Sequence, residues 1–179
     1  MIRTVAGVLV LSAYSTAAAA FSNCNEFRAR LAAAEAQLRI PVPRVMFKEL
    51  ESLPGLGVEF DLGNVQGFVG QLNCRHDGRF DFFQVQQKQS DDYSSRRFVN
   101  LLTAAIWAFT DWPKEKIDTA VKRVLVELDR KIKDNRVRGG SIEDDRAYID
   151  LSDDELTNVQ VGGGRKHGLY FLVDDSVRD

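Results

Sequence analysis

Hydrophobic residues recur at helical intervals in three parts of this chain. The first helix is predicted to start at Asn23 or Asn25, either of which can cap it, and to end before Pro41. Its apolar stripe consists of Phe27, Leu31, Ala34 and Leu38. A second helix, 96–109, is apolar nearly all round, so we expect it to be buried. A third helix, 113–133, has apolar residues on one side and Lys and Arg on the other.

Alternating apolar and polar residues predict strands on both sides of the two central helices. Three strands precede these helices, at 58–62, 65–74 and 79–87. Three more follow them, at 147–151, 156–161 and 169–173. The turns between the early strands are short, which favours antiparallel pairing. Residues 41–57 fit neither pattern clearly, and a short helix over 45–50 is the interpretation we take forward.

The order of these elements predicts the fold class. Strands and helices come in separate runs rather than in strict β-α-β alternation, which is typical of α+β proteins. We therefore expect an antiparallel β-sheet built from two three-stranded meanders. The N-terminal helix and the two central helices are expected to pack against this sheet.

The first twenty residues have the pattern of a cleavable signal peptide. Arg3 gives a positive start, residues 5–14 are mostly apolar, and a run of small residues ends at Ala20. Cleavage is expected after Ala20 or after Ala19, which leaves 21–179 as a single α+β domain. A membrane-spanning helix needs about 20 apolar residues. The leader reaches that length only if its alanine tail is counted, so no stable span is expected after cleavage, and an uncleaved anchor is the alternative.

Two cysteines, Cys24 and Cys74, both follow the leader. In an oxidising compartment, two cysteines in one small domain are usually paired, so we predict a disulfide. It would close a loop of about 50 residues and stabilise the fold by roughly 4 kcal/mol in the chain-entropy model. Two buried reduced thiols are the alternative. Leader and cysteines together predict a periplasmic or secreted protein.

The balance of charges bears on the class of partner. The chain has 24 Lys and Arg against 26 Asp and Glu, and the leader contributes only Arg3 to this count. Broad nucleic-acid binding requires a basic surface, which this composition does not provide. No nucleic-acid partner is therefore predicted.

The segment 162–168, GGGRKHG, is the most suggestive for ligand binding. Glycine lets backbone amides approach an anion, and the basic side chains add positive charge. The candidate anion-binding residues are Gly163, Gly164, Arg165, Lys166 and His167. The alternative is a solvated hairpin loop, because the spacing does not match a nucleotide-binding phosphate loop.

Other polar patterns do not define a site. The acidic residues in 143–155 lack the spacing of a calcium-binding loop. Glu59 and Asp61 alternate with apolar residues, so we expect them to face solvent rather than act as a glycosidase pair. His76 lies near Cys74, but two further metal ligands at recognisable spacing are missing. No catalytic residue, metal or cofactor is predicted.

Two further groups of side chains have a structural and a functional interpretation. Trp107, Phe109 and Trp112 could form an aromatic ligand site, although core packing at a helix corner explains them more simply. The third helix has a basic edge that is either solvated or presented to a partner. Its residues are Lys114, Lys116, Lys122, Arg123, Arg130, Lys131 and Lys133.

These observations favour an exported soluble domain that acts without catalysis, as a protein-interaction or envelope-accessory protein with an unknown protein partner. The first alternative is a small-anion or ligand-binding module that uses the Gly162–Gly168 loop. The second is a hydrolase whose residues are brought together only by the fold. The order of helices and strands does not decide between these three functions, because one fold can carry many functions.

Overall fold

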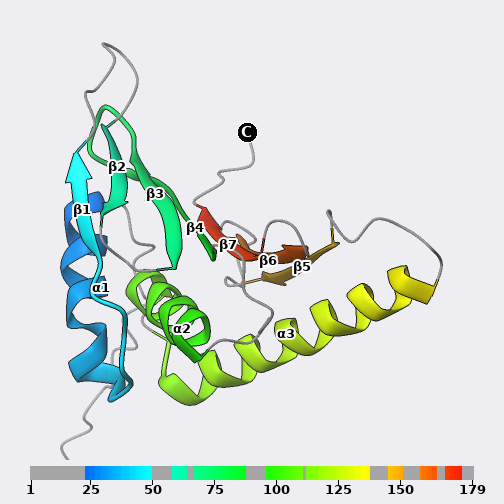
Figure 1. Ribbon diagram of the computed structural model, residues 1–179. Helices are drawn as coiled ribbons and strands as arrows, with labels where there is room; N and C mark the ends of the chain where they lie inside the picture. Colours follow the sequence, from blue (N-terminus) through cyan, green and yellow to red (C-terminus); the bar gives the residue numbers. More distant parts are fainter. Residues whose placement is uncertain are drawn as a thin grey trace, which may run out of the picture.

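The computed structural model describes residues 23–49, 58–63, 67–87, 96–110, 112–137, 145–150, 158–164 and 168–174. Along the chain these residues form α1 (Cys24–Leu38), β1 (Met46–Glu49), β2 (Val58–Gly63), β3 (Phe68–Cys74), β4 (Phe80–Gln87), α2 (Arg96–Thr110), α3 (Lys114–Val137), β5 (Asp145–Asp150), β6 (Asn158–Gly164) and β7 (Gly168–Asp174). Figure 1 shows the described helices and strands in this order.

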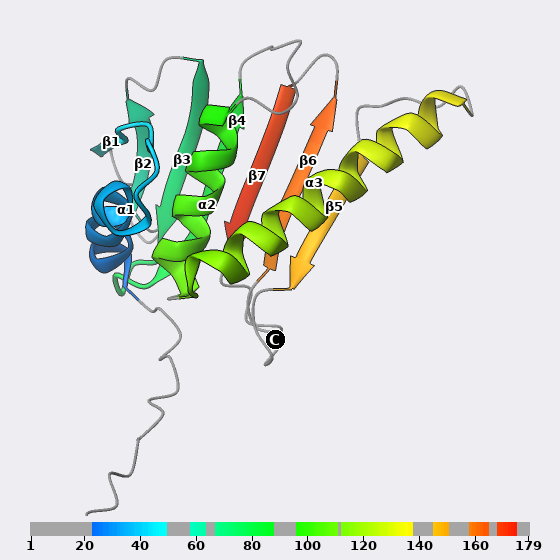
Figure 2. The ribbon, with the colours of Figure 1, turned by 90° about the horizontal axis from the view of Figure 1, so that it is seen from below.

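The strands form one antiparallel sheet with the order β1-β2-β3-β4-β7-β6-β5. Neighbours along the chain pair with one another, except at the centre, where β4 pairs with β7. The three helices lie on one face of this sheet: α1 beside β1, α2 across the middle and α3 over β6 and β5 (Figure 2). The α+β class predicted from the sequence is thus confirmed.

The first meander has four strands, where the sequence predicted three. The extra strand is β1, in the segment for which we expected a short helix over 45–50. Met46 to Glu49 instead pair residue by residue with β2, from Met46 opposite Gly63 to Glu49 opposite Phe60. A segment this short has no reliable period of its own, so the available sheet edge decides its conformation. The second meander, β5-β6-β7, has the three strands expected.

Helix α1 begins and packs as its sequence predicts. The side chain of Asn23 caps it by accepting a hydrogen bond from the amide of Asn25 at 2.8 Å. The apolar stripe Phe27, Leu31, Ala34 and Leu38 is buried. The helix ends at Leu38, before Pro41, and Arg39 follows in the left-handed conformation with φ of 54°.

Phenylalanine rings form much of the core between sheet and helices. Phe83 of β4 lies at its centre, with ring centroids 5.2 Å from Phe27, 6.1 Å from Phe47 and 5.8 Å from Phe171. These rings come from α1, β1 and β7, so one side chain connects three parts of the fold. Full burial of such a ring contributes about 1.5–3 kcal/mol. As predicted, α2 is buried nearly all round, and its Phe98 packs on Phe171 with centroids 5.6 Å apart.

Helix α3 starts where Pro113 permits it. The carbonyl of Pro113 accepts hydrogen bonds from the amides of Lys116 and Ile117, at 3.0 Å and 3.2 Å. The helix continues to Val137, four residues beyond the predicted end. Its predicted apolar stripe is buried at Ile117, Val121, Val124, Leu128 and Ile132.

Candidate functional site

A disulfide connects the start of α1 to the end of β3. Cys24 and Cys74 are bonded with their Cα atoms 6.0 Å apart and 50 residues apart in sequence, which confirms the predicted bridge. The amide of Cys24 also donates to the carbonyl of Gly78 at 3.1 Å. Since Cys74 is consumed by this bond, it is not a metal ligand together with His76. The N-terminal end of α1 is therefore fastened to the β3–β4 hairpin.

A groove of about 840 Å³ lies between α1 and the segment 42–47. The wall on α1 consists of Asn25, Arg28, Ala29, Leu31, Ala32 and Glu35. These residues recur at helical spacing, so they share one side of α1. The opposite wall is mostly apolar and includes the first half of β1. The volume lies within the range typical of ligand-binding clefts, about 300–1,000 Å³.

Both walls of the groove are fixed to the rest of the fold. The α1 wall is held by the disulfide and by the buried stripe of the helix, to which the lining residue Leu31 also belongs. The other wall is held by α2, where the side-chain amide of Asn100 donates to the carbonyl of Pro41 at 2.8 Å. Between the walls, the guanidinium carbon of Arg28 lies 5.4 Å from the ring centroid of Phe47. The groove is thus preformed, as binding sites usually are.

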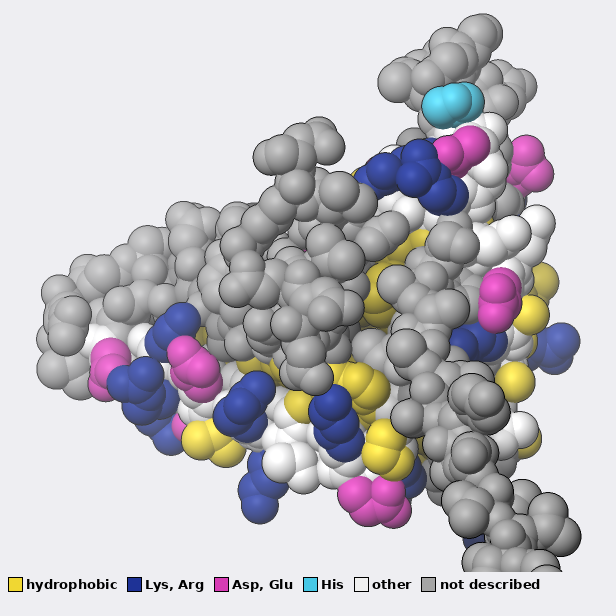
Figure 3. Space-filling model, turned by 180° about the vertical axis from the view of Figure 1, so that it is seen from behind, with side chains coloured by type: hydrophobic (Ala, Val, Ile, Leu, Met, Phe, Trp, Pro, Cys, Tyr) yellow, Lys and Arg dark blue, Asp and Glu magenta, His cyan; other side chains and the backbone are white. Residues whose placement is uncertain are grey.

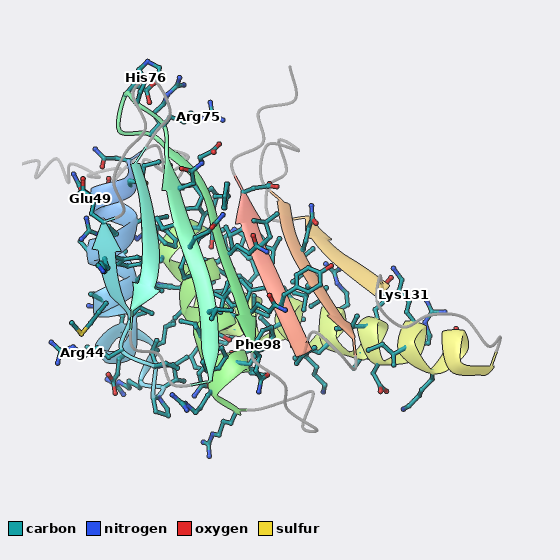
Figure 4. All side chains as sticks on the ribbon, turned by 45° about the horizontal axis from the view of Figure 1, so that its top comes forward. Arg44, Glu49, Arg75, His76, Phe98 and Lys131 are labelled. Carbon is teal, nitrogen blue, oxygen red and sulfur yellow. A yellow bond between two sulfur atoms is a disulfide. The ribbon has the colours of Figure 1, made fainter. Side chains whose placement is uncertain are left out.

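The side chains of the β1 wall alternate in exposure. Arg44, Met46 and Lys48 are exposed, while Val45 and Phe47 are partly buried against the core. Met46 keeps 53% of its surface exposed, and among the large hydrophobic residues of the described part of the chain only Val126 is more exposed. Figure 4 shows Arg44 and Glu49 near opposite ends of β1, at the outer border of the molecule.

β1 is also an edge strand. Within the described ranges it is paired on one side only, by β2, so the backbone N–H and C=O groups on its other side have no strand partner there. Unpaired edges attract further strands, and proteins usually restrict this with short strands, Lys and Pro. β1 has four residues, carries Lys48 and follows Pro43, so it has all three restrictions.

The glycines of the predicted anion loop are largely part of the sheet. Gly162, Gly163 and Gly164 belong to β6, where they pair with Tyr170, Leu169 and Gly168 of β7. A Cβ on Gly162 would overlap the ring of Tyr170, and one on Gly163 would lie 2.9 Å from a methyl carbon of Leu169. A side chain at either position would therefore require the Tyr170 ring or the Leu169 methyl group to move. Arg165, Lys166 and His167 lie outside the described residues, and anion binding by this segment stays a prediction.

The aromatic residues near the α2–α3 junction pack as a structural corner. Phe109 is buried, whereas Trp107 and Trp112 are partly buried against the core. Arg30 of α1 lies over Trp107, 5.1 Å from its ring centroid, and donates to the Trp107 carbonyl at 3.0 Å. Lys116 lies 3.5 Å from the ring centroid of Trp112. Each indole therefore has a cation against its ring.

The basic edge of α3 is neutralised in large part by its own acids. Ion pairs one turn apart join Lys114 to Asp118, Lys131 to Glu127, Lys133 to Asp129 and Arg130 to Asp134. Figure 3 shows Lys or Arg and Asp or Glu side chains interspersed along the border that α3 forms. Such a mixed surface is typical of a solvated helix rather than of an anionic-polymer site.

The β3–β4 hairpin carries the remaining polar cluster. His76 and Arg75 project at its tip (Figure 4). The backbone amide and the guanidinium of Arg79 donate to the Asp77 carboxylate at 3.1 Å and 2.6 Å. These hydrogen bonds hold the pKa of Asp77 below its usual value. The Asp77–Arg79 pair thus stabilises the turn of the hairpin.

Within the described ranges, no three His, Cys, Asp or Glu side chains gather as a metal site requires. Helices long and apolar enough to cross a bilayer are likewise absent from the part of the chain that the structure describes. The structure does not describe the side chains of Glu59 and Asp61. The same holds for nearly all side chains of the acidic segment 143–155.

No protein family, curated protein or solved structure matches this chain. The groove beside α1 therefore has to be interpreted from its own geometry. Sequence reasoning missed it because residues 42–47 were assigned to an ambiguous segment. The available signal was the alternation of Arg44, Met46 and Lys48 with apolar neighbours directly after two prolines.

Proposed function

We propose that this chain is an exported, non-enzymatic protein that binds a segment of a partner protein in the groove between α1 and β1. The observation that carries the proposal is the groove itself: about 840 Å³, bounded by a fixed helix and running along an edge strand. Such a site offers both side-chain contacts and backbone hydrogen bonds, which is the combination used in peptide recognition.

The chemistry of the lining favours binding over catalysis. Its ionisable side chains are Arg28, Glu35 and Arg44. Arginine stays protonated and does not act as a general base. A lone glutamate without a nucleophile or a second acid–base group beside it does not form a catalytic set. The lining is otherwise apolar or amide, as a binding surface requires.

The disulfide supports the exported location. Structural disulfides persist in oxidising compartments and are rare in the cytosol. The bond between Cys24 and Cys74 also fixes the α1 wall of the groove. Binding therefore depends on export, because the α1 wall of the groove is fixed by a disulfide that does not persist in the reducing cytosol.

A photo-crosslinking amino acid at position 46 tests the proposal in the native compartment. Met46 lines the groove and is 53% exposed, so we expect a specific adduct there. The same group at Val126, which is 61% exposed on α3, is the matched control. A partner that crosslinks equally at both positions, or at neither, contradicts the proposal.

Two alanines on α1 provide a sharper control. Ala32 lines the groove, whereas the neighbouring Ala33 is exposed and lies outside the lining. Ala32→Trp should fill the groove and abolish the adduct at position 46. Ala33→Trp adds the same bulk to the same helix and should leave the adduct intact. If the two variants behave alike, the partner does not occupy the groove.

A further inference from the structure

We infer that the partner segment is an extended stretch of five residues, with an acidic residue at each end and three apolar residues between, added as a strand to the free edge of β1. This inference rests on the proposed function, since it names the occupant of the same groove. It follows from the length of the groove, its edge strand and the charges along that edge.

The length of the groove selects a short extended segment. The α1 wall runs from Asn25 to Glu35, which at 1.5 Å per residue is about 15 Å of helix. An extended strand advances about 3.3 Å per residue, so four to five residues match this length. An extended segment, unlike a helical one, can also pair its backbone with an edge strand.

The edge of β1 supplies the backbone partner for such a segment. Its outer side is unpaired within the described ranges, and a five-residue guest opposite 44–48 would pair with β1 at 46–48 and extend beside 44 and 45. A guest strand would complete the hydrogen bonding of β1 while resting against α1. The restrictions on this edge do not oppose a short guest, because they limit the length of pairing rather than prevent it.

The charges along the edge select the ends of the guest. Arg44, Met46 and Lys48 alternate on the exposed side, so a cation, an apolar residue and a second cation face outward in turn. Within the described residues, neither Arg44 nor Lys48 takes part in an ion pair. Residues directly opposite on paired strands interact, and opposite charges there are favourable. Asp61 of β2 lies opposite Lys48 on the paired side of β1, so the preference for an acid is stronger at Arg44 than at Lys48. An acid–apolar–acid pattern is attracted to this edge.

The other side of the guest faces the groove. There its second and fourth residues meet Ala29, Ala32 and Val45, which leave space for apolar side chains of moderate size. The full pattern is therefore acid, apolar, apolar, apolar, acid. Such a pattern also excludes proline at the centre, because proline removes a backbone donor and disrupts strand pairing.

Three fluorescent peptides test this pattern against the oxidised full chain by anisotropy. All are capped and carry the same Gly-Ser linker, and their cores are Glu-Val-Leu-Val-Glu, Lys-Val-Leu-Val-Lys and Glu-Val-Pro-Val-Glu. We expect the first peptide to bind about tenfold more tightly than the second, because both cross-strand charge pairs are reversed. We expect the proline peptide to bind at least about tenfold more weakly than the first.

Charge reversal on the protein completes the test. Arg44→Glu with Lys48→Glu should invert the preference, so that the lysine peptide binds more tightly than the glutamate peptide. Lys122→Glu with Arg123→Glu makes the same change on the exposed side of α3 and should leave the order unchanged. A protein that does not discriminate between the peptides, or that binds the proline peptide equally well, overturns the inference.

The two proposals fail in different ways. If the Ala32→Trp variant abolishes the adduct at position 46 but peptide charge has no effect, the groove still binds a partner and the acidic strand is wrong. If the protein prefers the peptides in the expected order but no adduct forms in the native compartment, the binding specificity is correct and the proposed cellular function is wrong.

Discussion

Removal of the Cys24–Cys74 bond should cost about 4 kcal/mol of stability. The bond joins residues 50 positions apart, and closing a loop of that length in the unfolded chain costs about 14 cal/mol/K of entropy, or about 4 kcal/mol at 25 °C. Both cysteines are buried, so alanine is the appropriate replacement at each position. Serine would add a buried hydroxyl group without a partner, which has its own cost.

Urea unfolding followed by circular dichroism measures this loss. The double variant Cys24→Ala with Cys74→Ala should have a free energy of unfolding about 4 kcal/mol lower than the oxidised wild type. For a chain of this size, each kcal/mol corresponds to about 2–4 °C in Tm. In thermal unfolding, the Tm of the double variant should therefore be about 8–16 °C lower than that of the oxidised wild type. The slope of the urea dependence should rise slightly, because the unfolded chain without the bond exposes more surface.

Wild type in reducing agent is the matched control for the double variant. Both proteins lack the constraint on the unfolded chain, so their unfolding curves should agree within about 1 kcal/mol. A loss below about 1 kcal/mol in the double variant would show that the bond does not limit the unfolded state as reasoned. A large difference between the variant and the reduced wild type would instead assign the effect to packing of the buried sulfurs.

Three smaller changes test the local reasoning. Gly162→Ala should cost about 1–3 kcal/mol through overlap with the Tyr170 ring, and little in a Tyr170→Ala background, in a double-mutant cycle by urea unfolding. Asn23→Ala should cost about 0.5–2 kcal/mol through loss of the α1 cap, measured by the same method. Asp77→Asn should destabilise the protein at neutral pH but not in strong acid. The folded-state pKa of Asp77 is lowered by Arg79, so its contribution is present above the unfolded-state pKa and disappears as pH falls through the folded-state value. An Asp77 carboxyl resonance that titrates at or above the usual aspartate pKa would contradict this assignment.

The helices could be predicted from the sequence because their apolar stripes are long. Phe27 to Leu38 repeat over three turns, and α3 repeats its stripe for longer still, so local periodicity and tertiary burial agree. The four residues of β1 are too few for such agreement. Their conformation depends on the edge of β2, which lies later in the chain and could not be placed from periodicity.

The candidate site was harder to predict from the sequence than the fold. Its walls come from α1 and from residues 42–47, and only the arrangement of both on the sheet edge creates a groove. A loop was also predicted where none exists: the glycines at 162 and 163 indicated a loop, but the structure has a strand there. Their lack of a side chain accommodates Tyr170 and Leu169, a requirement that depends on the register of β6 and β7.

The position of β7 at the centre of the sheet has a consequence for biosynthesis. β7 pairs with β4, although two helices and two strands separate them along the chain. Until β7 has been made, β4 lacks its central neighbour and the two groups of strands cannot form one sheet. The last step of sheet formation therefore waits for residues 168–174. Long-range pairing of this kind folds slowly.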